Sequence, residues 1–508
     1  MKIEYICHAA LLIDTGDARI ATDPWFAGPA YCGQWHVFPK PVATDHLRDV
    51  DHIVVSHGHE DHLHEPTLRT LPKTATFLYP YTWYAGMPEY LHCLGFEDAR
   101  EMPTFKTHRI SERTAITLVS NNLDSVIVVE SGGQVLVNVN DSLHSHHANV
   151  ITLFTRALKA RWPRIDMLFC GFGGASYFPN TLHVEGKDDA EVGALREQLF
   201  AHNFCRIVDG LQPRVAVPFA ADFVLLDPGK TWINQTRFPR QELPRYYAEN
   251  FSADGGPTIL PLYPGDVLED GEHTVRSPYR EQLRNGRLEH LVAAQYGAES
   301  RARATPTQLA GKAGEAAMAA FLPRLEANLR RRAGLFDRQT LERARFTVRL
   351  TDIVGENCIE VAFAGGEPVL RRGGTPAEDS RLLFESTTEI LEYSFASEWG
   401  GDVITIGYGC EIYLKDQAAV AEKLDTLCVR LLTNHPVASR YMRGEPGRAA
   451  KYLLNNPLTL QWGVRRLRLG SRLNDVHRPQ VWLSRTKCEI CQICDMPLLD
   501  DRFAQQLS

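Results

Sequence analysis

The feature that most constrains this chain is a run of metal-ligand residues placed directly after a buried strand. Residues 51–56 read DHIVVS, a buried-strand pattern, and HGHEDH follows at 57–62. A loop at a strand end can bring several side chains to one point, which a regular strand or helix cannot do for four ligands. The chain is therefore predicted to fold around a metal site in this loop. The predicted ligands in the loop are His57, His59, Asp61 and His62.

Neutral imidazoles and a carboxylate clustered in this way suit zinc, iron or manganese. Together they can hold two ions a few ångströms apart. The alternative is a histidine-rich surface loop, but four ligand-type residues in this order after a strand are uncommon by chance. His64 lies just beyond the motif and is predicted to support the ligands or to lie at the surface.

Size and charge narrow the class of protein. At 508 residues the chain is long enough for two or three domains. A net charge of -7 and the absence of a long basic run argue against a nucleic-acid partner, and Arg330–Arg332 is expected to be a solvated helix face. No signal peptide and no membrane-spanning run of about 20 apolar residues is evident. Eleven cysteines without a disulfide-like framework favour a reducing compartment, so a cytoplasmic protein is expected.

The first 270 residues read as an α/β domain. Short β runs are separated by turn residues, and helical patterns at 150–159 and 189–211 interrupt them. The predicted strands are 3–6, 10–13, 53–55, 116–119, 126–129 and 135–139.

A second, α+β domain with a helical linker is expected over residues 271–480, before a cysteine-containing tail at 481–508. Residues 305–345 have apolar positions at helical spacing. Strand patterns are predicted at 346–350, 358–363 and 403–413, and a helix is predicted at 418–441.

The motif at 57–62 resembles that of the metallo-β-lactamase superfamily, which implies a four-layer αββα sandwich. Further segments at 5–9, 22–25 and 139–141 resemble the branch that contains ascorbate-phosphate lactonase and N-acylphosphatidylethanolamine phospholipase D. The closest resemblance is to the non-Rieske part of the CMP-N-acetylneuraminate hydroxylase family. It rests on FGGASYFP at 172–179, LQPR at 211–214 and VPFA at 217–220, with matching spacing from the metal motif.

The resemblance also implies roles for individual residues. His57 and His59 correspond to ligands of one metal position, and Asp61 and His62 to ligands of the other. Asp141 matches the carboxylate that bridges both positions, with a turn-forming aspartate as the alternative. His8 and Asp23 match positions near the site, where orienting or catalytic roles are expected, and a structural role is equally open for each.

Two histidines of the superfamily pattern are missing. The stretch at 120–124 reads SNNLD, without the histidine that many members have there, and Phe219 stands where a final histidine is expected. The site is therefore expected to be mononuclear, or dinuclear with open positions that favour binding of substrate or O₂. The substitutes considered for the missing ligands are His144, His146, His147 and His183.

Electron supply is a separate question. The hydroxylase family carries a Rieske domain, which needs paired Cys and His motifs that this sequence lacks, so a ferredoxin-type donor is expected. Cys488, Cys491 and Cys494 have the spacing of iron–sulfur or zinc sites and are a candidate cluster, although three cysteines in a tail can also be inert.

The leading hypothesis is a metal-dependent oxygenase, using one or two iron ions, that hydroxylates a polar small molecule such as a nucleotide-sugar. The second is a zinc hydrolase of a phosphodiester, ester or lactone, in which the metal lowers the pKa of water. In both, Asp61, Asp141 and His8 are the candidate catalytic residues. A third hypothesis is a binding protein that holds metal without turnover.

Overall fold

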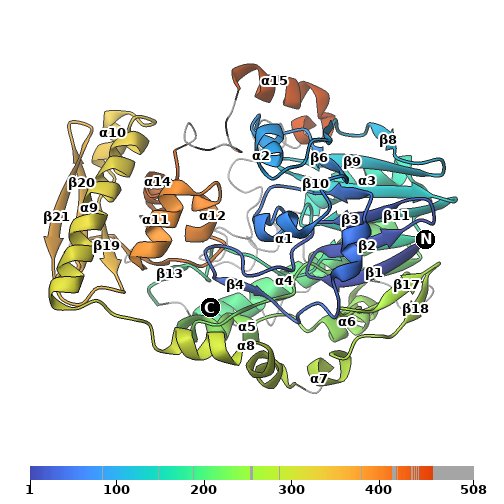
Figure 1. Cartoon of the computed structure of the whole chain (residues 1–508), viewed down its shortest axis with the longest axis horizontal. Helices are drawn as coiled ribbons and strands as arrows, with labels where there is room; N and C mark the ends of the chain where they lie inside the picture. Colours follow the sequence, from blue (N-terminus) through green and yellow to red (C-terminus); the bar gives the residue numbers. More distant parts are fainter. Residues whose placement is uncertain are drawn as a thin grey trace.

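Two mixed β-sheets packed face to face make up the N-terminal part of the protein (Figure 1). The computed structural model describes residues 1–461 except 83, 147, 187, 252–255, 285, 379, 415–418, 420–421, 436–438, 440, 442 and 444. The first sheet has the order β18-β17-β1-β2-β3-β5-β6-β7. Its strands are β1 (Lys2–Cys7), β2 (Ala10–Asp14), β3 (Arg19–Thr22), β5 (His52–Val54), β6 (Thr76–Pro80), β7 (Ala99–Met102), β17 (Val267–Glu269) and β18 (Glu272–Thr274).

The second sheet has the order β16-β14-β12-β11-β10-β9-β8. Its strands are β8 (Thr107–Arg109), β9 (Thr114–Asn121), β10 (Asp124–Ser131), β11 (Gln134–Asn140), β12 (Met167–Gly171), β14 (Val215–Phe219) and β16 (Thr258–Ile259). Side chains that alternate along the strands fill the space between the two sheets, as Val54 of β5 and Ile127 of β10 show. A short two-stranded pair joins β4 (Trp35–Val37) to β15 (Phe223–Leu225).

Helices cover the outer face of each sheet. α1 (Glu65–Thr70) and α2 (Met87–Cys93) share an apolar core with the outward side chains of the first sheet. α3 (Ala148–Arg161), α4 (Asp189–Leu211) and α6 (Leu243–Asn250) do the same on the second sheet. The predicted αββα sandwich is thus confirmed, and α4 has the predicted bounds.

A third sheet, at the left of Figure 1, forms the additional α/β region, with the order β13-β23-β22-β19-β20-β21. Its strands are β13 (Leu182–Val184), β19 (Phe346–Leu350), β20 (Cys358–Ala364), β21 (Glu367–Gly373), β22 (Leu382–Ser386) and β23 (Glu411–Leu414). β13 belongs to the N-terminal half but pairs with β23, and one apolar core runs through both parts. The domain boundary near residue 270 stays a prediction, and this sheet crosses it.

The main difference from the predicted elements lies at 403–413, which was expected to be one strand. Val403 and Ile404 instead end helix α12 (Gly400–Ile404), and the strand β23 begins only at Glu411. The β-branched pair favours a strand locally, but both side chains are buried in the shared core. Within 418–441, the described helix is α14 (Leu424–Leu431).

The remaining described helices include those that pack beside the third sheet. They are α5 (Thr231–Gln235), α7 (Arg280–Arg284), α8 (Leu288–Ala304), α9 (Gly311–Ala333), α10 (Arg338–Glu342), α11 (Thr388–Ala396) and α15 (Pro446–Asn455), with 3₁₀ turns η1 (Asp45–Asp49), η2 (Pro228–Lys230) and η3 (Arg240–Glu242). Among the residues with a described position, no helix is long and apolar enough to cross a membrane.

Candidate metal centre

The motif at 57–62 forms a loop between β5 and α1, as predicted. Its far end is fixed by His64, whose ring accepts a hydrogen bond from the Thr67 backbone N–H at 3.3 Å and so caps α1. The other ring nitrogen of His64 lies 3.2 Å from the Pro29 carbonyl oxygen, and the side chain is fully buried. His64 therefore supports the loop rather than lying at the surface.

One group of ligand-type atoms comes from His57, His59 and Asp124. The His57 Nε2 and His59 Nδ1 atoms are 2.8 Å apart, and a carboxylate oxygen of Asp124 lies 3.9 Å from His57 Nε2. All three ligand atoms fall within 4.8 Å of one another. Asp124 begins β10, at the position where the superfamily histidine is missing from the sequence.

A second group comes from His8, Asp61 and His62. The Asp61 Oδ2 atom lies 3.1 Å from His8 Nε2 and 3.3 Å from His62 Nε2. Their ligand atoms also fall within 4.8 Å of one another. His8 follows β1 and brings an imidazole to this group.

Asp141 lies between these two groups. One of its oxygens is 3.5 Å from His62 Nε2, and Asp141, His57 and His62 make a third set within 4.8 Å. Because it joins one member of each group, this carboxylate is placed to bridge two ions, as the resemblance implies.

A small polar network holds the histidine rings from behind. Asp23 accepts hydrogen bonds from the Ser56 backbone N–H at 2.7 Å and from Asn140 Nδ2 at 2.7 Å. The Ser56 hydroxyl lies 2.9 Å from His57 Nδ1, and Asn140 Nδ2 lies 3.1 Å from His62 Nδ1. The Nδ1–H of His57 can therefore donate to the Ser56 hydroxyl and leave Nε2 toward the centre, the arrangement that orients a metal-ligating imidazole, while at His62 the Asn140 amide N–H faces Nδ1 as a donor.

The backbone turns sharply where strands deliver residues to the site. His8, Asp23 and Asn140 have φ values of 47°, 41° and 48°, in the left-handed region that non-glycine residues rarely occupy. Each lies at the end of a strand, namely β1, β3 and β11. This conformational cost is typical of residues held for function by the surrounding structure.

The donor set fits divalent metal ions. Asp61, Asp124 and Asp141 converge with four imidazoles, and burial raises the pKa of Asp124 to about 6. Within the described residues, His8 Nδ1, His62 Nε2 and one oxygen of Asp141 are buried without a hydrogen-bond partner. Buried polar atoms of this kind call for a ligand, and a cation would also offset the repulsion among the carboxylates.

A cavity of about 290 Å³ opens onto these groups. Part of its wall is aromatic: Trp35 stacks on Phe223 with 3.5 Å between ring centroids, and Tyr177 also lines the cavity. The C-terminal region contributes Asp402 and Ile406 to the lining.

The C-terminal region also covers the metal loop itself. The Trp399 indole N–H donates to the Gly58 carbonyl at 2.7 Å, and the Tyr393 hydroxyl donates to Glu60 at 3.1 Å. A Cβ atom at Gly58 would overlap the Tyr441 hydroxyl, so the glycine is required for this close approach. Sequence reasoning missed these contacts because the partners lie more than 300 residues apart.

The other predicted site residues are distributed as follows. His144 lines the cavity, beside Gly171 and Gly174, but belongs to none of the three ligand groups. His183 lies in β13 of the third sheet, where it pairs with Asp189 and Glu411. His146 is not among the cavity-lining residues. His147 and the three tail cysteines lie outside the described residues. Asp124 was missed, although it is the one carboxylate in the stretch that lacks the expected histidine.

Comparison with known proteins agrees with the αββα fold and the metal-ligand motif described above. Residues 2–149 match the family described as "Beta-lactamase superfamily domain", and the chain therefore carries a domain of the metallo-β-lactamase superfamily. The chain is 26% identical over 252 residues to the cytidine monophosphate-N-acetylneuraminic acid hydroxylase of Danio rerio, and 28% identical over 253 residues to that of Mus musculus. Each alignment covers 46% of this chain and about two fifths of the relative, 40% and 41% respectively. The resemblance to that family is confirmed.

A solved structure with a similar fold is CmlA, a diiron β-hydroxylase from Streptomyces venezuelae. It has 17% sequence identity and a TM-score of 0.37, and the match covers 53% of this chain and 54% of that one.

Proposed function

We propose that the protein is an iron-dependent oxygenase that hydroxylates a small polar metabolite at a two-metal centre. The observation that carries this proposal is the composition of the ligand groups. One ion would be held by His57, His59 and Asp124, the other by His8, Asp61 and His62, and Asp141 would reach both. Each group has two histidines and one carboxylate, the set typical of non-haem iron(II) oxygenases.

Iron held by these residues would supply redox chemistry with O₂. The surrounding residues position and shield the reacting groups. The Tyr31 hydroxyl donates to Asp61 at 2.5 Å and fixes that carboxylate opposite His8, while the aromatic wall of Trp35 and Phe223 limits entry of water.

Hydroxylation of a C–H bond inserts one atom of O₂ and reduces the other to water. This reaction takes two electrons and two protons, for which we propose a ferredoxin-type donor. A cluster at Cys488, Cys491 and Cys494 stays a prediction, tested by charge-transfer absorption that the full chain has and a Cys491→Ser variant lacks.

The curated relatives support the reaction class by their names. Both are hydroxylases of cytidine monophosphate-N-acetylneuraminic acid, and the aligned part includes the metal motif. A nucleotide-sugar is therefore one candidate substrate. Since the alignment covers only about two fifths of those proteins, substrate assays should include other polar metabolites as well.

A zinc hydrolase of a phosphodiester, ester or lactone is the second candidate. The superfamily match over residues 2–149 and the intact HGHEDH motif favour it. In that case Asp61 and Asp141 would orient the attacking water.

Metal analysis of protein purified without oxygen and without added metal separates the two candidates. We expect about two iron ions per chain, and label from ¹⁸O₂ in the product of a converted substrate. Zinc as the sole metal, with undiminished turnover under strict anaerobiosis, would refute the oxygenase.

Ligand variants test the site itself. His57→Ala and Asp61→Ala are expected to lose most bound metal while the circular dichroism spectrum stays that of the folded protein, because the preceding strand packs through apolar residues. The control His46→Ala, a partly exposed histidine paired with Glu4, should keep its metal.

A further inference from the structure

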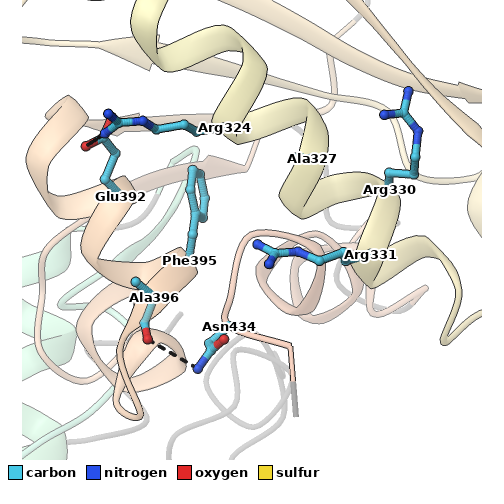
Figure 2. A pocket seen from close by; sticks show the side chains of 8 residues that line it. All are labelled: Arg324, Ala327, Arg330, Arg331, Glu392, Phe395, Ala396 and Asn434. Carbon is cyan, nitrogen blue, oxygen red and sulfur yellow. Dashed lines mark hydrogen bonds and ion pairs between the residues drawn. The ribbon is translucent and has the colours of Figure 1, made fainter. Parts of the chain in front are cut away.

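A second cavity lies between α9, α11 and the segment after α14, apart from the metal centre. Its volume is about 890 Å³, within the range of roughly 300–1,000 Å³ typical of small-molecule sites. It is lined by Arg324, Ala327, Arg330, Arg331, Glu392, Phe395, Ala396 and Asn434 (Figure 2). None of these residues lines the metal cavity, and the proposed oxygenase reaction uses none of them.

The charges around this cavity are not balanced. Arg324 pairs with Glu392 at 2.5 Å, and Arg330 pairs with Glu326 at 2.7 Å. Arg331 has no carboxylate partner among the described residues, and Figure 2 shows its guanidinium pointing toward Phe395 and Asn434. One positive charge in the cavity is therefore left without a counter-ion.

The residue beneath adds to the positive potential. Arg332 is buried and donates to the Asn434 carbonyl at 2.9 Å, and among the described residues it too has no carboxylate partner. Burial and the charge of Arg430 lower the pKa of Arg332 to about 10. An anion in the cavity would contact the guanidinium of Arg331, and among the described residues no carboxylate neutralises it or the neighbouring Arg332.

Asn434 offers a second recognition element. Its side-chain N–H lies 3.5 Å from the Ala396 carbonyl, while its Oδ1 atom is buried without a hydrogen-bond partner. The residue is only 5% exposed, and a buried acceptor of this kind normally has a hydrogen-bond partner. A ligand with a hydroxyl or amino group would satisfy this acceptor.

The floor of the cavity is apolar. The Phe395 ring and the Ala327 side chain line it beside the polar groups. In Figure 2 the Phe395 ring stands between Arg324 and Arg331, where an apolar ligand body would contact it.

We propose that this cavity binds a small organic anion. Its carboxylate or phosphate would pair with Arg331, whose planar guanidinium suits both groups. A hydroxyl or amino group would donate to Asn434 Oδ1, and an aromatic or aliphatic body would pack on Phe395.

The experiment is calorimetric titration of the full-length, metal-loaded protein with three probes of the same ring. These are 4-hydroxybenzoate, 4-hydroxyphenyl phosphate and the neutral 4-hydroxybenzamide. We expect at least one of the anions to bind at least tenfold more tightly than the amide. Arg331→Ala should weaken that binding at least tenfold. The control Arg338→Ala, an exposed arginine that does not line the cavity, should change it less than twofold.

Two further measurements make the result decisive. Because an anion can also bind metal ions, the titration is repeated on His57→Ala, which should retain the binding. Melting curves of both arginine variants should match the wild type, since Arg331 is exposed. Failure of both anions to bind at millimolar concentration, equal affinity for the neutral amide, or binding that Arg331→Ala leaves intact would overturn the proposal.

Discussion

At the scale of single residues, one carboxylate distinguishes the proposed metal centre from the superfamily pattern. Asp124 completes the group of His57 and His59, where the superfamily pattern offers a third histidine. The set of two histidines and one carboxylate is typical of non-haem iron(II), so we expect the choice of metal in the proposed centre to depend on this position.

The first prediction exchanges that ligand. Asp124→His is expected to keep two ions per chain but to shift the bound metal from iron toward zinc, measured by elemental analysis after expression in medium containing both metals. Asp124→Ala should lose about one ion per chain. The exposed Asp49→Ala is the control and should match the wild type. An unchanged iron-to-zinc ratio in Asp124→His would show that Asp124 is not a ligand.

The second prediction concerns the glycine inside the motif. Gly58→Ala places a methyl group against the Tyr441 hydroxyl, so overpacking should destabilise the cover by roughly 1–3 kcal/mol. We expect a lower melting temperature and faster release of metal to a chelator. The double variant Gly58→Ala/Tyr441→Ala should release metal more slowly than the summed effects of the two single variants would give. Strict additivity of the two changes would contradict this close contact.

At the scale of elements, the third sheet joins the two halves through β13 and a half-buried ionic network. His183 lies 2.7 Å from Asp189 and also pairs with Glu411, which Lys230 contacts at 3.1 Å. Burial alone would lower the pKa of His183, but the two carboxylates outweigh it and raise the pKa to about 9. The histidine is therefore positively charged at neutral pH and stabilises the pairing of β13 with β23.

The third prediction follows from this shift. Since the folded pKa of about 9 exceeds the ordinary 6.5, the stabilisation is complete below pH 6.5 and is lost as the pH rises through 9. It amounts to at most roughly 3 kcal/mol. The melting temperature of His183→Gln should fall well below that of the wild type at pH 6.5, and the gap should narrow by pH 9.5. The control is His92→Gln, at an exposed position, whose melting temperature should differ from that of the wild type by the same amount at both pH values. A difference for His183→Gln that also stays constant with pH would contradict the charged network.

The sequence predicted those features that local chemistry determines. The motif loop follows its strand as expected, α4 has the predicted bounds, and Asp141 closes β11 beside the ligands. His8 was expected near the site, but its pairing with Asp61 depends on how β1 lies against the motif loop.

Features set by distant contacts could not be predicted in this way. Asp124 joins the candidate ligand group only because β10 brings its first residue to His57, and the α12 helix buries Val403 in a core shared by both halves. The contact between the Tyr441 side chain and Gly58 joins residues almost 400 positions apart, and no local pattern in either segment indicates it.

At the scale of the whole molecule, the metal ions should stabilise the fold as well as supply chemistry. Asp61, Asp124 and Asp141 are held together in a buried site on which the N-terminal sheets and the C-terminal cover converge. Like charges at this spacing repel, and cations at the centre would offset the repulsion. Ligands that bind only the folded state add roughly 4 kcal/mol when present at a thousand times their dissociation constant.

The last prediction uses the sign of this effect. Removing metal with a chelator should lower the melting temperature of the wild type by several degrees, because the buried carboxylates lose their counter-ions. Asp124→Asn removes one of these charges. We therefore expect it to melt below the wild type when metal is present, since a ligand is lost, but at or above the wild type when metal is absent, since less negative charge is buried. Asp49→Asn, at an exposed position, should follow the wild type in both states. If Asp124→Asn were less stable than the wild type to the same extent with and without metal, the carboxylate would be stabilising the fold by itself, and its assignment as a metal ligand would fail.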